Sequence, residues 1–252
     1  MKKYVIIRAD DLGFSEAVNF GIAKTVKEGP VRTVGLMVNM GAAEHGLNLL
    51  EKNDCCIGLH SNISVGRPVC RPDEIPTLVD QDGAFYPSSR YRSGENFADS
   101  GDIYREISAQ YKRFLEMTGK KPSYFEAHAV MNRRLEAVLR QIAGEYGLLY
   151  QPAFSSFQAG DRIVEICAMH SMEEGYDAGT AIREELSRIQ DDHCHVYVCH
   201  PGYLDSYLWN HSSLRLPRMD EVDMLCDPGL RIWMEQEEIV SMTYDELRSA
   251  SV

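Results

Sequence analysis

The sequence predicts an α/β fold in which helices cover a parallel sheet, as a (β/α) barrel of the TIM type or a deformed or incomplete version of one. Strand and helix patterns alternate at least six times along the chain, which is typical of parallel sheets. The 252 residues and 44% hydrophobic content match the ~250 residues that such a barrel takes. No G-x-G-x-x-G follows the first strand, which disfavours the alternative, a doubly wound open sheet. Because no linker or repeat interrupts the chain, we expect one domain over residues 1–252.

The first third of the chain shows the alternation clearly. An apolar run at Tyr4–Ile7 predicts a strand. Apolar residues spaced four apart predict a helix over Ser15–Glu28, which the serine can cap and Gly29 ends. The same signals predict a strand at 31–39, a helix at 42–52 and a strand at 55–60. Residues 61–100 contain four prolines and little periodicity, so we expect a long loop, which is often functional.

Regular patterns resume after this loop. A helix is predicted from Asp102 to Gly119, where glycine and then Pro122 end the pattern. The elements predicted after it are a strand at 123–127, a helix ending at 147, strands at 148–154 and 162–168, a helix at 177–190, a strand at 195–199 and helices from 218 onwards.

Composition excludes some classes of function. The net charge of −12 argues against a nucleic-acid binder, which needs a basic surface for the phosphates. No apolar run approaches the length of a membrane span, and the apolar run before Arg8 is too short for a signal peptide. The seven cysteines are scattered and form no C-x-x-C. We therefore expect reduced thiols and a cytoplasmic protein.

Polar residues follow several of the predicted strands. Asp10 and Asp11 end the first strand, His60 the third, His128 the strand at 123–127, and His200 the strand at 195–199. Carboxyl ends of parallel strands meet at one rim, where α/β folds place active sites. One aspartate and two histidines are the ligand set of a catalytic metal site with open positions, and a second acid could accept a proton.

A second cluster also resembles a metal site. It is the run D-D-H-C-H at residues 191–195. Because it precedes a predicted strand, we expect it at the opposite, structural end of the fold.

The chain resembles the YdjC/ChbG family of carbohydrate deacetylases, and the similarity extends over nearly its whole length. The motif A-D-D-x-G-x-S stands at residues 9–15, followed by Asn19 and Gly21 in register. The family's G-x-H-x-N-x-x-x-G-x-P stands at residues 58–68. The segments V-R-T-V-G-L-M-V-N, C-H-P-G and P-R-M-D-E-V-D-M-L match further blocks.

The resemblance implies a (β/α)-barrel-like homodimer with one divalent metal ion, Mg²⁺ or Zn²⁺. Carried over, the metal ligands are Asp11, His60 and His128, the catalytic base is Asp10, and the catalytic acid is His200. The implied reaction is removal of acetyl groups from N-acetylated sugars of the N-acetylglucosamine type, with a water activated by the metal attacking the acetamide. The sequence assigns no substrate-binding residues, sugar length or linkage.

The chain also departs from the family. Many members have a histidine-rich motif around the second ligand histidine, which is absent at Tyr124–Asn132, and an arginine where this chain has Gln151. These departures keep two alternatives open: another barrel metal hydrolase acting on a phosphoester or a different amide, and a metal-bound carbohydrate sensor without turnover. Glu126 reads either as a partner of a ligand histidine or as an ordinary strand residue. Aromatic residues of the long loop and after His200 read either as sugar-stacking or as packing.

Overall fold

The computed structural model describes residues 2–93, 97–130, 132–153, 155–160, 162–189 and 193–249. The elements in chain order are β1 (Lys3–Leu12), α1 (Glu16–Glu28), β2 (Thr33–Leu36), α2 (Ala43–Leu50), β3 (Cys56–Ser61), the 3₁₀ turn η1 (Pro72–Glu74), α3 (Ser88–Arg92), α4 (Ser100–Thr118), β4 (Phe125–Ala127), α5 (Arg133–Tyr146), β5 (Phe157–Ala159), β6 (Arg162–Ile166), α6 (Ala178–Ser187), β7 (His193–Cys199), α7 (Ser206–His211), α8 (Leu216–Cys226), α9 (Pro228–Gln236), β8 (Ile239–Ser241) and α10 (Tyr244–Ser249).

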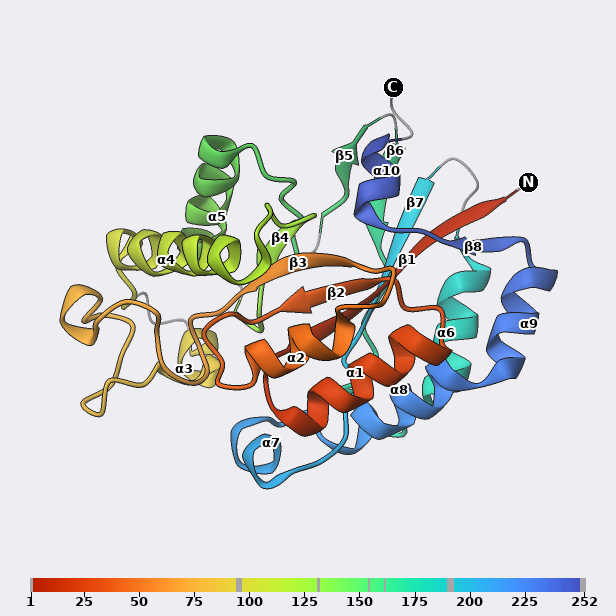
Figure 1. Ribbon diagram of the computed structural model, residues 1–252, viewed down its shortest axis with the longest axis horizontal. Coiled ribbons are helices and arrows are strands. Elements are labelled where there is room, and N and C mark those ends of the chain that lie inside the picture. The colour runs from red at the N-terminus through yellow and green to blue at the C-terminus, as the bar shows by residue number, and fades with distance from the viewer. Residues whose placement is uncertain are drawn as a thin grey trace.

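One curled sheet organises the described residues. Its strand order is β4-β3-β2-β1-β7-β6-β5, and β8 pairs with the start of β1. All pairs are parallel except β5 with β6. Within this part of the chain β4 and β5 are the two edges, so the strands form an incomplete barrel with β1 near its centre (Figure 1). The predicted fold class, an incomplete (β/α) barrel, is confirmed.

Strand β1 is buried on both faces. Val5, Ile7 and Ala9 belong to one hydrophobic cluster, which includes residues from most of the helices. Ile6 belongs to a second cluster with residues of β6 and β7. A strand covered on both faces needs apolar residues at successive positions, which explains why the predicted strand is a continuous apolar run. Helix α1 packs against α2 and α8, and α4 packs against α5 (Figure 1).

Most predicted elements are found with shifted ends. Helix α1 begins where predicted, because the Ser15 hydroxyl accepts a hydrogen bond from the Val18 amide. The predicted strand at 148–154 is wrong: this segment makes one isolated bridge, from Tyr150 to Phe125, and the next strand is β5. Pro152 has no N–H to continue a ladder, and Phe154 lies outside the described residues.

The described residues of the long loop predicted at 61–100 include short helical segments and buried side chains. The loop contains η1 and α3, and Ile75, Leu78 and Tyr91 are buried in the main hydrophobic cluster. The Tyr91 hydroxyl donates a hydrogen bond to the Ile63 carbonyl at 2.9 Å. The loop is therefore fixed beside the carboxyl end of β3, where it can shape a binding site.

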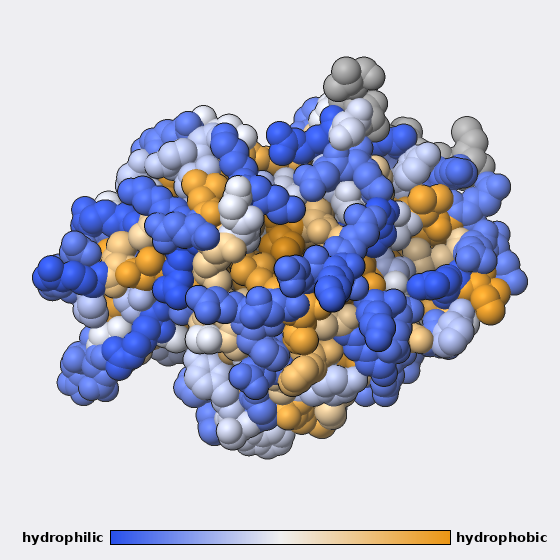
Figure 2. All heavy atoms as spheres, viewed as in Figure 1, coloured by the Kyte–Doolittle hydropathy of each residue, from blue (hydrophilic) through white to orange (hydrophobic). Residues whose placement is uncertain are grey.

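The visible surface is mostly hydrophilic. Figure 2 shows hydrophilic residues over most of this face, with hydrophobic ones exposed between them near its centre. Among the described residues, no helix combines the length and hydropathy that crossing a membrane requires.

Candidate active site

Three side chains from three strands converge at the carboxyl rim of the sheet. Asp11 lies near the end of β1, His60 in β3 and His128 just after β4. The Oδ1 atom of Asp11 is 3.2 Å from Nε2 of His60 and 2.9 Å from Nδ1 of His128. The two ring nitrogens are 3.0 Å apart. The predicted ligand set is therefore brought together in space.

The backbone at Asp11 makes this convergence possible. Neighbouring side chains of a regular strand point to opposite faces. Asp11 has a φ of +74°, a left-handed conformation that costs a non-glycine residue about 1–3 kcal/mol and often marks functional sites. The register of β1 against β2 also shifts between Ala9 and Leu12. As a result both acids approach the His60 ring, with Oδ2 of Asp10 at 4.0 Å from its Nδ1.

The three donor atoms fit one divalent cation. The His60 Nδ1–H donates to Oε1 of Glu126, which assigns the tautomer and directs the Nε2 lone pair at the other two donors. Separations of 2.9–3.2 Å can be spanned by one ion with bonds of ~2.0–2.2 Å. Carboxylate and imidazole suit several divalent metals, Zn²⁺ among them. Of the two interpretations of Glu126 that the sequence left open, the structure supports the partner of a ligand histidine, because Glu126 accepts from His60.

Charges hold the acid of this cluster ionised. Burial raises the pKa of Asp11, but His128 and Arg218 outweigh burial and bring the pKa well below its ordinary value. The Arg218 guanidinium donates to Oδ2 of Asp11 at 2.6 Å, which leaves Oδ1 for the histidines. Burial lowers the pKa of His60, but Glu126 and Asp10 outweigh it and raise the pKa well above 6.5. The surroundings of the His60 ring therefore favour positive charge.

Asp10 has one engaged and one unengaged oxygen. Its Oδ2 accepts from Arg8 at 2.6 Å, and its buried Oδ1 has no hydrogen-bond partner among the described residues. A side chain at position 35 of β2 would collide with this oxygen, because a Cβ on Gly35 would lie 2.8 Å from Oδ1. A buried carboxylate oxygen without a partner is costly. It is also free to accept a proton from a bound molecule.

His200 lies beside these acids. Cys199 pairs with Ala9 in the parallel sheet. The residues that follow them, His200 and Asp10, therefore lie at the same rim. The His200 amide donates to Oε2 of Glu221 at 2.5 Å. Burial lowers the pKa of His200 to about 4 and raises the pKa of Glu221 to about 7. The His200 ring is thus neutral at pH 7, and its Nδ1 has no hydrogen-bond partner in the described chain.

Gln151 is linked to Asp10 only through other side chains among the contacts of the described residues. It is buried, and its Oε1 accepts a hydrogen bond from the Tyr244 hydroxyl. Tyr244 also interacts with the Arg8 guanidinium, which stands 5.4 Å over the Tyr124 ring. Gln151 is therefore separated from Asp10 by Tyr244 and Arg8. The positive charge beside Asp10 comes from Arg8 of the same strand.

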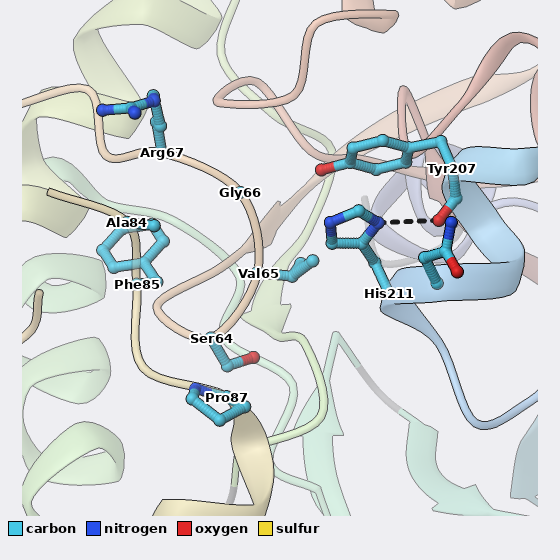
Figure 3. A pocket seen from close by; sticks show the side chains of 10 residues that line it. Ser64, Val65, Gly66, Arg67, Ala84, Phe85, Pro87, Tyr207 and His211 are labelled. Atoms are coloured by element: carbon cyan, nitrogen blue, oxygen red, sulfur yellow. Dashed lines mark hydrogen bonds between the residues drawn. The ribbon is translucent and has the colours of Figure 1, made fainter. Parts of the chain in front are cut away.

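A pocket opens near the metal-type cluster. Its volume is about 390 Å³, and its walls are residues 64–67, Ala84, Phe85 and Pro87 on one side and Tyr207, Asn210 and His211 of α7 on the other (Figure 3). The Phe14 ring links it to the cluster, at 5.8 Å from the Tyr207 ring and 6.4 Å from that of His128. Other loop aromatics pack on one another, with the ring of Phe97 against Tyr86 and Tyr91.

The histidines of the run at 191–195 lie at the predicted end of the fold, but not before the strand. His193 and His195 lie at the amino-terminal end of β7, opposite to the rim that carries His60. The expectation that they precede the strand is wrong, because β7 begins at His193; β6 gives them a parallel partner there. Asp191 and Asp192 lie outside the described residues.

Comparison with solved structures defines the class of fold first. The structure superposes on a crystal structure of an Enterococcus faecalis V583 protein with a TM-score of 0.84 and 21% identity, covering 98% of this chain and 99% of that one. A family 4 carbohydrate esterase from Streptomyces lividans superposes with a TM-score of 0.52 and 12% identity, covering 95% of this chain and 91% of that one. These proteins share the fold.

Sequence comparison then gives the family. The family model described as YdjC-like protein matches residues 4–236, and the chain belongs to that family. It is 32% identical to "Carbohydrate deacetylase" of Geobacillus stearothermophilus, over 98% of each chain. It is 30% identical to "Carbohydrate deacetylase 2" of Listeria innocua serovar 6a, over 96% of this chain and 98% of that one. It is also 27% identical to "Chitooligosaccharide deacetylase" of Klebsiella pneumoniae, over 92% of this chain and 94% of that one.

Sequence reasoning missed three charged residues of the site. Arg218 and Glu221 stand in the block P-R-M-D-E-V-D-M-L, which carried the resemblance but received no role. Arg8 directly precedes the A-D-D motif. Only Arg8 carried a signal in the sequence: it follows the apolar run Tyr4–Ile7, and a charged residue in a buried strand needs a partner.

Proposed function

We propose that this protein is a metal-dependent carbohydrate N-deacetylase that hydrolyses the acetamide of N-acetylglucosamine-type sugars. The observation that carries the proposal is the convergence of Asp11, His60 and His128 beside the unengaged Oδ1 of Asp10. The relatives named carbohydrate deacetylase support the reaction type. Asp10 and His200 are both present and near one another, which favours an enzyme over a sensor.

The metal ligands in this proposal are Asp11, His60 and His128. When bound there, a divalent cation such as Zn²⁺ or Mg²⁺ supplies Lewis-acid chemistry, polarising the acetamide carbonyl and lowering the pKa of water towards ~7. Arg218 fixes the Asp11 carboxylate through Oδ2, and Glu126 fixes the His60 ring through Nδ1. These contacts keep the donor atoms in place without rearrangement.

Asp10 is the proton acceptor in the proposed reaction. Water attacks the acetamide carbon, and the proton of that water passes to Oδ1 of Asp10, the oxygen left without a partner. Arg8 holds Oδ2, so the carboxylate keeps one orientation. His200 is the proposed proton donor to the departing amine nitrogen. Its ring starts neutral, so the proton that it donates is the one that Asp10 accepted from water: this proton passes through His200 to the amine nitrogen as the C–N bond breaks. The products are acetate and an amino sugar.

The pocket of Figure 3 is the proposed place for the sugar. The Phe14 ring lies between this pocket and His128, in contact with the rings of Tyr207 and His128. Tyr207 offers an apolar ring surface, which suits the flat face of a pyranose, and the buried Phe85 lines the opposite wall. Its volume of about 390 Å³ lies within the ~300–1,000 Å³ of ligand pockets. Tyr86, Tyr91 and Phe97 serve packing within the loop instead.

The test of the function is acetate release from N-acetylglucosamine oligomers by metal-stripped protein, with and without added Zn²⁺ or Mg²⁺. We expect activity that depends on the metal and on Asp10. Binding of the oligomers without acetate release would favour the sensor alternative. Release from acetylated substrates that resists exhaustive chelation would contradict the metal dependence.

Assembly and location remain predictions. We infer a homodimer from the family resemblance, and sedimentation of the purified chain tests it. We infer a cytoplasmic protein from the cysteines, all seven of which are free thiols. Fractionation of cells that express the chain with its native ends tests the location.

A further inference from the structure

A second cluster of metal-type side chains lies on the sheet, remote from the active site. Glu165 of β6 and His193 and His195 of β7 offer ligand atoms that all lie within 4.8 Å of one another. His195 pairs with Val5 of β1 and with Glu165 of β6. Six strand residues therefore separate its level from that of Asp11, about 20 Å at the ~3.3 Å rise per residue of a parallel strand.

The strand geometry presents these side chains together. His193 and His195 are two residues apart in β7, so their side chains share one face of the sheet. The in-register position of Glu165 beside His195 places its carboxylate on that face too. Its Oε1 lies 3.0 Å from Nδ1 of His193, and its Oε2 lies 3.9 Å from Nδ1 of His195. Both rings thus turn the same nitrogen towards one carboxylate.

We propose that Glu165, His193 and His195 form a second site for a divalent transition-metal ion of the Zn²⁺ type. Two imidazoles and a carboxylate are a zinc-type donor set that leaves a fourth position for water. The side chains are 40%, 18% and 9% exposed for Glu165, His193 and His195, so an ion can enter from solvent. Each imidazole can supply one nitrogen lone pair and the carboxylate an oxygen to the same divalent ion, because all three ligand atoms lie within 4.8 Å of one another.

The location of this cluster indicates a structural role for the ion rather than a catalytic one. The cluster lies at the end of the sheet opposite to the rim where α/β enzymes bind substrate. Its ligands join β6 to β7, next to the antiparallel edge strand β5. A bound ion would clip these strands together and stabilise the folded state without taking part in acetyl hydrolysis.

The chain contains a matched control. His170 lies 3.0 Å from Glu173 through Nδ1 and 3.1 Å from Glu185 through Nε2. Each of its nitrogens therefore meets a different carboxylate, and these bonds raise the pKa of the ring. The two carboxylates lie on opposite sides of the ring, so His170 does not join a second histidine around one shared carboxylate. His170→Ala removes a histidine and its carboxylate contacts without touching the proposed site.

The experiment is a Zn²⁺ titration of the metal-stripped full chain by calorimetry. We expect the wild type and His170→Ala to bind one more Zn²⁺ per chain than Glu165→Gln/His193→Ala, which keeps its acetate-release activity. We also expect Asp11→Asn to weaken binding at the active site and to retain this additional ion, so the two sites are judged separately. Equal zinc stoichiometry and affinity in the double variant and the wild type would overturn the proposal.

A second measurement covers the case in which the double variant does not fold. Glu165→Gln alone changes a side chain that is 40% exposed and should leave the fold intact by circular dichroism. It should weaken Zn²⁺ at this site at least ~10-fold. It should also reduce the rise in Tm that Zn²⁺ gives an Asp11→Asn background. An unchanged affinity and an unchanged Tm response would count against the site.

Discussion

At the residue scale, the adjacent acids Asp10 and Asp11 differ in the side chains that contact them. The Oδ2 of Asp11 binds Arg218 and its Oδ1 faces two histidines, whereas Asp10 binds Arg8 and keeps one oxygen unengaged. The same side-chain chemistry therefore has two environments within one dipeptide. Such a division suits one ligand and one base.

Substitution of each acid tests this division. Asp11→Asn should bind metal more weakly and regain part of its activity as Zn²⁺ or Mg²⁺ is added, because an amide is a poorer ligand than a carboxylate. Asp10→Asn should keep the metal and lose about 10²–10⁴ in kcat, the usual effect of removing a general base. Metal content and acetate-release kinetics across a metal titration check both. Loss of metal from Asp10→Asn with full retention in Asp11→Asn would reverse the roles.

Glu221 should make stability depend on pH. Burial raises its folded pKa from 4.5 to about 7, so between those values the folded state binds more protons than the unfolded state. Its contribution to stability is therefore largest below pH 4.5 and is lost as pH rises towards 7. Each pKa unit corresponds to about 1.4 kcal/mol.

Glu221→Gln separates this effect from other titrations. A glutamine oxygen can still accept from the His200 amide, so the turn is kept. The free energy of unfolding of Glu221→Gln relative to the wild type should increase between pH 5 and pH 8. Urea denaturation at several pH values measures it. A difference that stays constant over this range would mean that Glu221 titrates normally in the folded protein.

At the element scale, helix α1 supports the turn that carries His200. Gly21 of α1 meets Gly202 so closely that a Cβ on Gly21 would lie 2.5 Å from the Gly202 Cα. The Tyr203 amide also donates to the Ala17 carbonyl at 3.1 Å. The helix and the H-P-G turn are therefore packed backbone to backbone, and the position of the His200 ring depends on the helix.

Gly21→Ala should separate the helix from this turn. We expect a loss of about 1–3 kcal/mol in stability, typical of overpacking, together with a lower kcat because His200 moves. The control is Gly144→Ala in α5, where an added Cβ meets nothing within 4 Å. That change should stabilise the protein by about 0.5–1 kcal/mol and leave kcat unchanged. Tm and acetate-release measurements on both variants test this. If both variants have the same Tm and kcat, the close contact between Gly21 and Gly202 does not position His200.

At the scale of the whole molecule, the sheet and its helices are held without covalent cross-links. All seven cysteines are free, and burial raises the pKa of the Cys55 thiol to about 11 and that of Cys194 to about 12. Buried thiols of this kind are unreactive near neutral pH. Stability therefore comes from the two hydrophobic clusters on the faces of the sheet.

Reducing agents should leave the thermal unfolding of the purified chain unchanged. No disulfide is there to be reduced, so neither the unfolded nor the folded state is altered. Calorimetry with and without dithiothreitol, and mass spectrometry after alkylation under denaturing conditions, check this. A Tm that falls on reduction, or fewer than seven alkylated thiols, would show that the cysteines pair.

The sequence by itself determined the alternation of strands and helices, the incomplete barrel and the polar residues at the strand ends. These depend on local patterns, because burial on both faces of β1 requires an apolar run and the rim collects the polar residues at the end of each strand. Only the tertiary structure decided that Asp11 turns left-handed, that Arg218 joins it across 207 positions of sequence, and that the segment at 148–154 is not a strand. Such features depend on contacts between distant segments, which a local pattern of residues does not record.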